Sequence, residues 1–396
     1  MLNELREYQR KLFHKNNFTY KRYFHAQINL DKKLVGIVGA RGVGKTTYLI
    51  QYLKDLDLPF SQKLYISADI ITISSLFDVA EAFSKEEGKV LVIDEIHKYK
   101  NFEIELKKIY DILDLKVIFS GSSALRINNS KADLSRRALL HNVYGLSFRE
   151  FIEMKKNISL PSFSLADILS NHINIAYELL EHFNLTLLFR EYIKYGYYPF
   201  YFADEEDYLL RLHETINTVI EIDIPSIFPI EYSSIQNLKK LVRLLCLSHP
   251  FTPNIKELLS KMDMGDNYKG LYRFLEYLHR AKIFNTIQST AKGDAIFVKP
   301  DKIYLNNTNL HYAYCSESNI GTLREVFITS MFRDNYRLSI PKKGDFFVDE
   351  KYTLEVGGKS KKYKQIKDLK DSFIVSDDIE IGSGNRVPLW LFGFLY

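Results

Sequence analysis

Short apolar runs recur in the first 150 residues, and helical spacing of apolar residues follows most of them. This alternation predicts buried parallel strands with helices between them, because each parallel crossover needs a long connection. The expected strands are residues 34–38, 63–69, 89–93 and 116–120, and helices are expected near 48–53 and 75–85. Residues 1–30 are expected to form a basic helix and a loop. The fold class is therefore α/β.

Helical periodicity dominates residues 150–230, where residues 175–183 and 208–222 are the longest expected helices. A different pattern begins near residue 233. Three shorter helices and then two strands are expected there, at 234–247, 254–261, 268–282, 283–287 and 302–305. Three helices followed by a hairpin predict a winged helix, which is a helix-turn-helix variant.

The third of these helices has basic residues on its expected outer face. Lys269, Arg273 and Arg280 recur at helical spacing, which suits contact with DNA phosphates, although Glu276 interrupts the stripe. Residues 254–302 contain nine Lys or Arg against six Asp or Glu, which is a weak surplus. A winged helix that serves only protein contact or lid packing explains the pattern equally well.

The strongest chemical signal follows the first strand. Residues 39–47 read Gly-Ala-Arg-Gly-Val-Gly-Lys-Thr-Thr, and a helix is expected directly after them. Strand, glycine-rich loop and helix are the context of a phosphate-binding P-loop, whose backbone N–H groups and helix dipole favour an anion. Lys45 is expected to reach the β- and γ-phosphates and Thr46 to ligate Mg²⁺. The nucleotide-binding residues are expected to be Gly39, Ala40, Arg41, Gly42, Val43, Gly44, Lys45, Thr46 and Thr47.

Two carboxylates end the strand expected at 89–93. Asp94 and Glu95 would lie at the carboxyl end of the sheet, which faces the ligand crevice in open α/β folds. Asp94 is placed to hold Mg²⁺ as a Walker B aspartate does, and Glu95 to activate the attacking water.

Other candidate catalytic residues follow the next strand. Ser120, with Ser122 as the second choice, is expected to sense the γ-phosphate. Arg137, or its neighbour Arg136, is a candidate arginine finger, acting within the subunit or across an interface. A basic helix end beside a carboxylate is the alternative for this pair.

These motifs resemble those of AAA+ ATPases of the archaeal-ATPase type, which are prokaryotic proteins with a C-terminal domain of unknown function of the DUF4143 kind. The matching stretches are residues 39–47, 92–97, 119–124, 146–151, 195–199 and 321–327. The resemblance spans nearly the whole chain. The family usually has Arg before the Asp of its helical region, but Ile222 precedes Asp223 here, so no role is transferred to that pair.

The C-terminal part resembles a restriction-endonuclease-like α/β core. Such a core has an Asp and then Glu-x-Lys on the next strand, around a metal ion. Asp345 and Glu355 match, but the lysine position is Gly357, and Lys359 is the nearest substitute along the strand. The resemblance therefore implies a second metal site in which either loop geometry brings the displaced lysine back or the site is degenerate, and we expect no DNA cleavage. A lysine-rich stretch follows, at Lys359, Lys361, Lys362, Lys364, Lys367 and Lys370; it suits an acidic partner or a solvated helix face.

The amino-acid composition excludes few classes of protein. The 396 residues are 46% hydrophobic with a formal net charge of +5, which is ordinary for a globular protein of several domains. We expect a P-loop core (1–149), a helical lid over the nucleotide (150–230), a winged helix (231–320) and a nuclease-like α/β domain (321–396). Only two cysteines, Cys246 and Cys315, and no signal or membrane segment favour a cytoplasmic protein without disulfides.

The pattern as a whole indicates an ATPase that uses ATP and Mg²⁺ to drive conformational change. DNA or another nucleic acid is the favoured target. An ATP-dependent switch acting on a protein partner and an ATP-gated DNA nuclease are the alternatives. A homo-oligomer is compatible with all three, and no membrane partner is expected.

Overall fold

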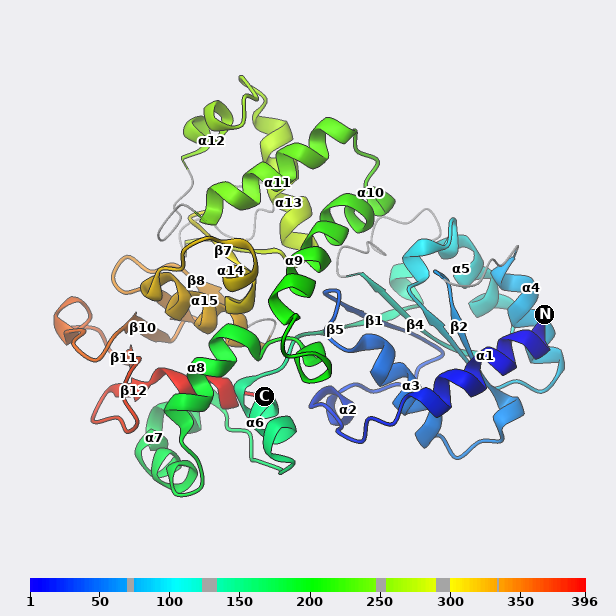
Figure 1. The fold of residues 1–396 in the computed structure, drawn as a ribbon, viewed down its shortest axis with the longest axis horizontal. Helices are drawn as coiled ribbons and strands as arrows, with labels where there is room; N and C mark the ends of the chain where they lie inside the picture. Colours follow the sequence, from blue (N-terminus) through cyan, green and yellow to red (C-terminus); the bar gives the residue numbers. More distant parts are fainter. Residues whose placement is uncertain (70–74, 123–133, 247–253, 290–299, 333–334) are drawn as a thin grey trace. The chain divides into compact units, whose positions relative to one another are not determined.

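The computed structural model describes residues 1–69, 75–122, 134–246, 254–289, 300–332 and 335–396. They divide into two units (Figure 1). The first contains Met1–Gly145 together with Ile222–Pro229, and the second contains Leu146–Glu221 together with Ile230–Tyr396. The four-part division expected from the sequence stays a prediction.

The first unit is built on a five-stranded parallel sheet. Its strands are β1 (Leu34–Gly39), β2 (Lys63–Ser67), β3 (Val90–Asp94), β4 (Lys116–Ser122) and β5 (Leu139–Val143). Their order is β2-β3-β4-β1-β5, and every neighbouring pair is parallel. The α/β prediction is confirmed. Because β4 lies between β1 and β3, the residues that end β4 stand between the P-loop and Asp94.

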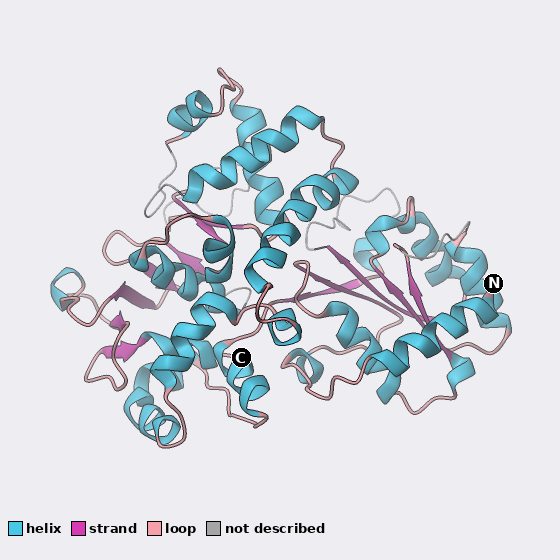
Figure 2. Cartoon of the chain, viewed as in Figure 1, coloured by secondary structure: helices cyan, strands magenta, loops and turns pink. Residues whose placement is uncertain are grey.

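Helices pack on both faces of this sheet (Figures 1 and 2). The helices of this unit are α1 (Leu2–Lys15), α2 (Phe24–Gln27), α3 (Lys45–Asp55), α4 (Leu76–Lys85), α5 (Phe102–Ile112) and α10 (Ile224–Ile227), with 3₁₀ turns η1 (Phe60–Gln62), η2 (Ile96–Lys98) and η3 (Leu134–Arg136). The chain crosses the sheet in one direction through α3 and returns through α4 and α5. Right-handed crossovers therefore place α3 on the face opposite α4 and α5.

A buried glutamine completes the outer edge of the sheet at β2. Gln9 of α1 is fully buried; its side-chain amide donates to the Lys63 carbonyl (3.2 Å) and accepts from the Tyr65 N–H (2.9 Å). An exposed edge would leave these backbone groups unpaired or open to another strand. The N-terminal helix thus closes the edge whose strand also supplies Tyr65 to the site.

The second unit begins with helices. These are α6 (Phe148–Lys156), α7 (Leu165–Leu180), α8 (Leu185–Tyr195) and α9 (Tyr208–Thr218), with a 3₁₀ turn η4 (Pro199–Ala203). A π-helical turn, η5 (Val219–Asp223), follows α9 and leads into the segment that belongs to the first unit. Ser147 and Ser164 begin α6 and α7 with capping boxes, so polar side chains satisfy the first N–H groups of both helices.

Three helices and an antiparallel strand pair come next. They are α11 (Tyr232–Cys246), α12 (Ile255–Lys261), α13 (Tyr268–Arg280), β6 (Phe284–Ile287) and β7 (Lys302–Leu305). The elements appear in the order that the sequence pattern predicts. That this arrangement is a winged helix stays a prediction.

The expectation of no disulfide is wrong. Cys246 ends α11 and Cys315 follows α14 (Thr308–Tyr314), and their sulfurs are 2.06 Å apart. The two residues are 69 positions apart in the sequence, but the fold brings their Cα atoms to 5.2 Å, within the range that a disulfide spans. Sequence spacing alone could not reveal this approach.

A second sheet forms the C-terminal part of this unit. Its order is β12-β11-β10-β9-β8, parallel from β10 to β12 and antiparallel at the other two pairs. The elements are α15 (Ile320–Phe332), β8 (Leu338–Ser339), β9 (Phe346–Val348), β10 (Tyr352–Gly357), η7 (Tyr363–Gln365), β11 (Ser372–Ser376), β12 (Arg386–Pro388) and η8 (Leu389–Phe394). No helix among the described residues is long and apolar enough to span a bilayer.

Candidate functional site

The P-loop adopts a conformation that only glycine accepts easily. Gly42 and Gly44 have φ angles of 84° and 98°, in the left-handed region. At Gly39, a Cβ atom would lie 2.4 Å from the Val143 carbonyl oxygen. The loop therefore curls tightly between β1 and α3, as phosphate binding by backbone N–H groups requires.

The P-loop lysine is folded onto its own loop. Lys45 is 5% exposed, and its Nζ donates to the carbonyls of Gly39 and Ala40, both at 3.1 Å. An ammonium bound only by neutral carbonyls retains its full charge for an anion that enters the loop. Among the other loop residues, Val43 is buried in the core and the Arg41 side chain is half-exposed.

Asp94 is the centre of a hydroxyl network. Its carboxylate is 2% exposed and accepts from Thr46 Oγ (2.6 Å), from the Tyr65 hydroxyl (2.7 Å) and from Ser120 Oγ. These donors come from α3, β2 and β4, so three separate elements orient one carboxylate. All three are neutral, which leaves the negative charge of Asp94 uncompensated by them. Burial, followed by the charge of Asp94, raises the pKa of Tyr65, which keeps this hydroxyl a donor.

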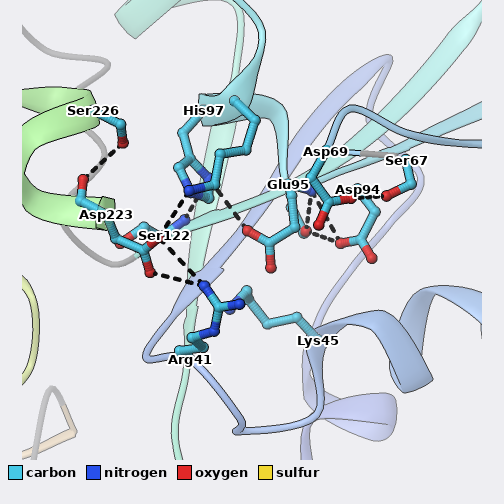
Figure 3. A network of polar contacts seen from close by, with 12 residues as sticks. Arg41, Lys45, Ser67, Asp69, Asp94, Glu95, His97, Ser122, Asp223 and Ser226 are labelled. Atoms are coloured by element: carbon cyan, nitrogen blue, oxygen red, sulfur yellow. Dashed lines mark hydrogen bonds and ion pairs between the residues drawn. The ribbon is translucent and has the colours of Figure 1, made fainter. Parts of the chain in front are cut away.

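Glu95 projects from a strained backbone position beside these residues (Figure 3). Its φ is 52°, an unusual value for a residue with a side chain, and functional sites often contain such residues. Its N–H is fixed by Asp94 Oδ1 (3.2 Å) and Ser120 Oγ (3.1 Å). Burial raises the pKa of Glu95, although Lys45 opposes the shift. A carboxylate with a raised pKa is a better proton acceptor at neutral pH.

His97 lies next to Glu95 and was not predicted. Its Nδ1 is 3.3 Å from Glu95 Oε2 and accepts from the Ser122 N–H at 3.3 Å. Burial lowers the pKa of His97 to about 4, so the ring is neutral at physiological pH. A neutral imidazole brings no charge to the site, and its ring limits where the Glu95 side chain can lie.

The predicted serine and arginine residues lie in different surroundings. Ser120 is fully buried, and its hydroxyl is used on Asp94, so it orients the acidic pair; a role toward phosphate stays a prediction. Arg137 instead pairs with Asp111 of α5, through Nε at 2.8 Å and Nη2 at 3.1 Å. Within this chain the structure therefore does not bring Arg137 to the P-loop. A finger role across an interface, by Arg136 or Arg137, stays a prediction.

Two further residues of the first unit were missed by the sequence analysis. Arg22, 7% exposed, donates to the carbonyls of Val43 (2.9 Å) and Gly145 (2.8 Å), which fixes the loop from behind. Asp223 contacts Arg41 of the loop and Lys98 of η2 (Figure 3). Arg22 belongs to no local motif, and Asp223 stands out in the sequence only as the Asp of the helical region, without the Arg that usually precedes it in the family.

The acidic pair expected in the C-terminal sheet lies in a lysine-rich setting. Asp345 Oδ2 accepts from the Val356 N–H at 2.8 Å, next to Glu355 in the sequence. Lys302 is 2.9 Å from Glu325 and 4.0 Å from Asp345. Glu355 is 1% exposed, and burial raises its pKa, although its hydrogen bond with Lys361 opposes the shift.

Lys361, and not Lys359, contacts Glu355. Its Nζ is 2.6 Å from Glu355 Oε1. The expectation of Lys359 assumed that the strand continues, but β10 ends at Gly357 and the chain turns, with the Lys361 N–H bonded to the Gly358 carbonyl. A Cβ atom on Gly357 would lie 2.7 Å from Lys361 Cδ, so the glycine provides the space for this lysine.

The residues of the C-terminal sheet do not fit a divalent metal ion well. The described parts of the chain contain no group of three His, Cys, Asp or Glu side chains placed to hold one. The ammonium group of Lys361 already pairs with Glu355, the more deeply buried of the two carboxylates. The second metal site at Asp345 and Glu355 therefore stays a prediction without support from the donor arrangement.

The basic stripe of α13 is shorter than expected. Lys269 and Arg273 are exposed, one helical turn apart. Arg280 instead pairs with Glu276, Nε to Oε1 at 3.0 Å. The outer face of α13 therefore presents two exposed cations in place of three.

Comparison with known proteins agrees with the P-loop assignment. Residues 31–152 match the family AAA domain, so the first unit contains a P-loop domain of the AAA type. Residues 186–319 match a domain of unknown function, DUF8612. The DUF4143 label expected from the sequence is not confirmed.

The chain is also similar to curated proteins of Methanocaldococcus jannaschii. The uncharacterized protein MJ1637 is 27% identical, with 91% of this chain and 82% of that protein covered. The uncharacterized protein MJ1544 is 22% identical, with 81% and 72% covered. Among solved structures, a RuvB variant of Thermotoga maritima is 16% identical with a TM-score of 0.32, and 64% of this chain and 82% of that chain are covered. Because this TM-score is low, the similarity supports no inference about this chain.

Proposed function

We propose that the first unit binds ATP with Mg²⁺ and hydrolyses it to drive conformational change. The observation that supports this most directly is the convergence of Lys45, Asp94 and Glu95 at the carboxyl ends of β1 and β3. A cation for the phosphates, a carboxylate for the metal and a carboxylate for water are the parts that phosphoryl transfer needs.

The donor set suits Mg²⁺. Thr46 Oγ and the Asp94 carboxylate are hard oxygen ligands, 2.6 Å apart and oriented by neutral hydroxyls. Together they would hold the ion beside the P-loop, where it would neutralise charge on the phosphates. Lys45 binds the phosphate oxygens, and the backbone of the loop fixes their position.

Glu95 activates water in this proposal. The attacking water donates to Glu95, whose raised pKa allows it to take the proton as the water oxygen bonds to the γ-phosphorus; the bond from that phosphorus to the bridging oxygen breaks, and ADP leaves. The fixed Glu95 N–H and the ring of His97 limit the positions of the carboxylate. Ser120 orients Asp94 and Glu95 together, so one hydroxyl aligns the metal ligand with the base.

Phosphate release tests this proposal. Glu95→Gln should bind ATP but lower turnover by roughly 10²- to 10⁴-fold, the scale of a positioned acid–base group. Glu81→Gln, on the exposed face of α4, is the matched control and should turn over at the parent rate. Parent-rate release by Glu95→Gln would remove Glu95 from the mechanism. What co-purifies with this ATP-retaining variant would identify the target.

We further propose that nucleic acid is the target. The support is the order α11, α12, α13, β6, β7 with exposed Lys269 and Arg273 on the third helix. Exposed lysines of the C-terminal part add positive charge, at Lys359, Lys362, Lys364, Lys367 and Lys370. Phosphate contacts of this kind are electrostatic and therefore weaken as salt rises.

A mobility-shift assay at two salt concentrations tests the target. Lys269→Ala with Arg273→Ala should weaken DNA binding by about 10-fold at 50 mM salt and by less at 200 mM salt. Lys240→Ala, whose lysine already pairs with Asp263, is the control. Equal binding by the parent and the double variant at both concentrations would favour the alternative, a switch that acts on a protein partner.

A further inference from the structure

Asp223 is an acidic residue that the hydrolysis mechanism does not use. It is 4% exposed and lies in the first unit, although the chain before and after residues 222–229 belongs to the second. Its carboxylate is 2.9 Å from Lys98 Nζ and 3.4 Å, through both oxygens, from Arg41 Nη1. A buried carboxylate thus has two cationic partners from two other segments.

Both cations belong to the nucleotide site. Arg41 is the middle residue of Ala40-Arg41-Gly42 in the P-loop, and Lys98 comes three residues after the catalytic glutamate. Figure 3 shows the Arg41 side chain reaching Asp223 beside Lys45 and Glu95. Burial raises the pKa of Glu95, the charge of Asp223 adds to this shift, and the charge of Arg41 opposes it.

The Asp223 carboxylate therefore places a negative charge beside Arg41 and Lys98, where the phosphates of a bound triphosphate would also place theirs. The Arg41 and Lys98 side chains already have an anion, whereas the Lys45 ammonium is held by neutral carbonyls. A terminal phosphate brings more charge and more acceptor oxygens than a carboxylate, so it competes for these donors.

We propose that Arg41 and Lys98 recognise the γ-phosphate of ATP and that Asp223 is the resident anion that the γ-phosphate displaces. The proposal rests on the nucleotide binding proposed above. A diphosphate lacks the displacing group and leaves the Asp223 contacts in place. Discrimination between ATP and ADP therefore depends on Arg41, Lys98 and Asp223.

Displacement of Asp223 has a direct path into the rest of the chain. The residue ends the π-helical turn η5 and precedes α10, a short helix joined to it by the Ser226 hydroxyl bond to the Asp223 carbonyl (2.7 Å). π-Turns are rare and are frequently found at functional sites. Through the covalent chain, loss of the Asp223 contacts frees the segment that links α9 to α11.

Nucleotide affinities test the recognition. In Asp223→Asn, which keeps the shape of the side chain, ATPγS should bind about 3- to 10-fold more tightly and ADP by less than 2-fold. Arg41→Ala should reduce the ATPγS preference, and adding Asp223→Asn to it should restore little, because the pair acts as a unit. Glu221→Gln, two residues away and paired with Lys239, is the matched control.

Hydrogen exchange of the parent protein provides a test that needs no variant. Amides of residues 219–229 should exchange faster with ATPγS than with ADP or without nucleotide. Equal exchange in all three states, or an ATPγS-to-ADP affinity ratio unchanged in Asp223→Asn, would overturn this proposal while nucleotide binding stands. Failure of the parent to bind either nucleotide would instead reject the proposed function.

Discussion

The P-loop site and the C-terminal acidic cluster place buried carboxylates at strands in opposite electrostatic settings. Asp94 is held by hydroxyls of Thr46, Tyr65 and Ser120, which orient it without cancelling its charge. Glu355 is instead paired with the ammonium of Lys361. Neutral donors leave a carboxylate able to bind a cation, whereas a lysine of the same chain already provides one. The donors around an acidic residue, more than its burial, therefore decide what it can bind.

Removal of the two carboxylates should therefore have unequal effects. Asp94→Ala should lower Mg²⁺-dependent phosphate release by at least about 10²-fold, because loss of even an outer partner of a metal ligand costs roughly 10- to 100-fold. Glu355→Ala should leave it within about 2-fold of the parent, because the proposed mechanism of hydrolysis does not use Glu355. We also expect no plasmid cleavage by the parent in Mg²⁺ or Mn²⁺, with or without ATP.

Cleavage that needs metal and disappears in Glu355→Ala would show that Glu355 binds a metal ion despite its ion pair with Lys361. The C-terminal part would then be a nuclease, and the lysine would serve a reaction in place of neutralising the cluster. Phosphate release by Asp94→Ala at the parent rate would show that Asp94 does not hold the Mg²⁺ used in hydrolysis.

A smaller effect is expected on the stability of the second unit. Lys361→Met leaves Glu355 buried without its partner and should lower the free energy of unfolding by about 1–3 kcal/mol at pH 7, the cost of an unpaired buried polar group. Lys359→Met, at an exposed neighbouring lysine, should change it by less than about 0.5 kcal/mol. Denaturant unfolding measures both variants.

The pH dependence of this difference in stability distinguishes a loss of charge pairing from a loss of packing. The pKa of folded Glu355 is raised above its ordinary value, so the folded state binds the proton more tightly and stability falls as pH rises between the unfolded and folded pKa values. Without Lys361 the pKa rises further. The penalty in Lys361→Met should therefore vanish below about pH 4, near the ordinary range of Glu. A penalty that is equal at pH 4 and pH 7 would mean that lost packing, and not charge, is its cause.

Residues that are close in sequence made much of the fold and site predictable. The P-loop and the Asp94-Glu95 pair are local patterns on apolar strands, and the predicted strands and main helices of the first unit are present. Partners that come from distant segments gave no such signal. Asp223 is 182 residues from Arg41, and Tyr65 is 29 residues from Asp94, so only the fold shows that they meet.

The errors have similar causes. Lys359 was expected because strand periodicity was extended past Gly357, where the chain in fact turns and brings Lys361 back. The Cys246–Cys315 disulfide depends on how α11 and α14 pack, which residue spacing does not encode. In each case, local pattern gave the residue types, and tertiary contacts decided which of them meet.

Isothermal titration of ATP into the parent and Lys45→Ala measures whether the P-loop lysine binds the nucleotide. The Lys45 ammonium is bound only by loop carbonyls, so its removal should leave the fold intact. A charged hydrogen bond contributes roughly 1.5–3 kcal/mol, which corresponds to a Kd about 10- to 100-fold weaker. Lys54→Ala, on the same helix α3 and exposed, should bind ATP as the parent does. Saturable binding by the parent that weakens about 10- to 100-fold in Lys45→Ala is the expected result, and equal ATP affinity of the two proteins would show that Lys45 does not bind the nucleotide.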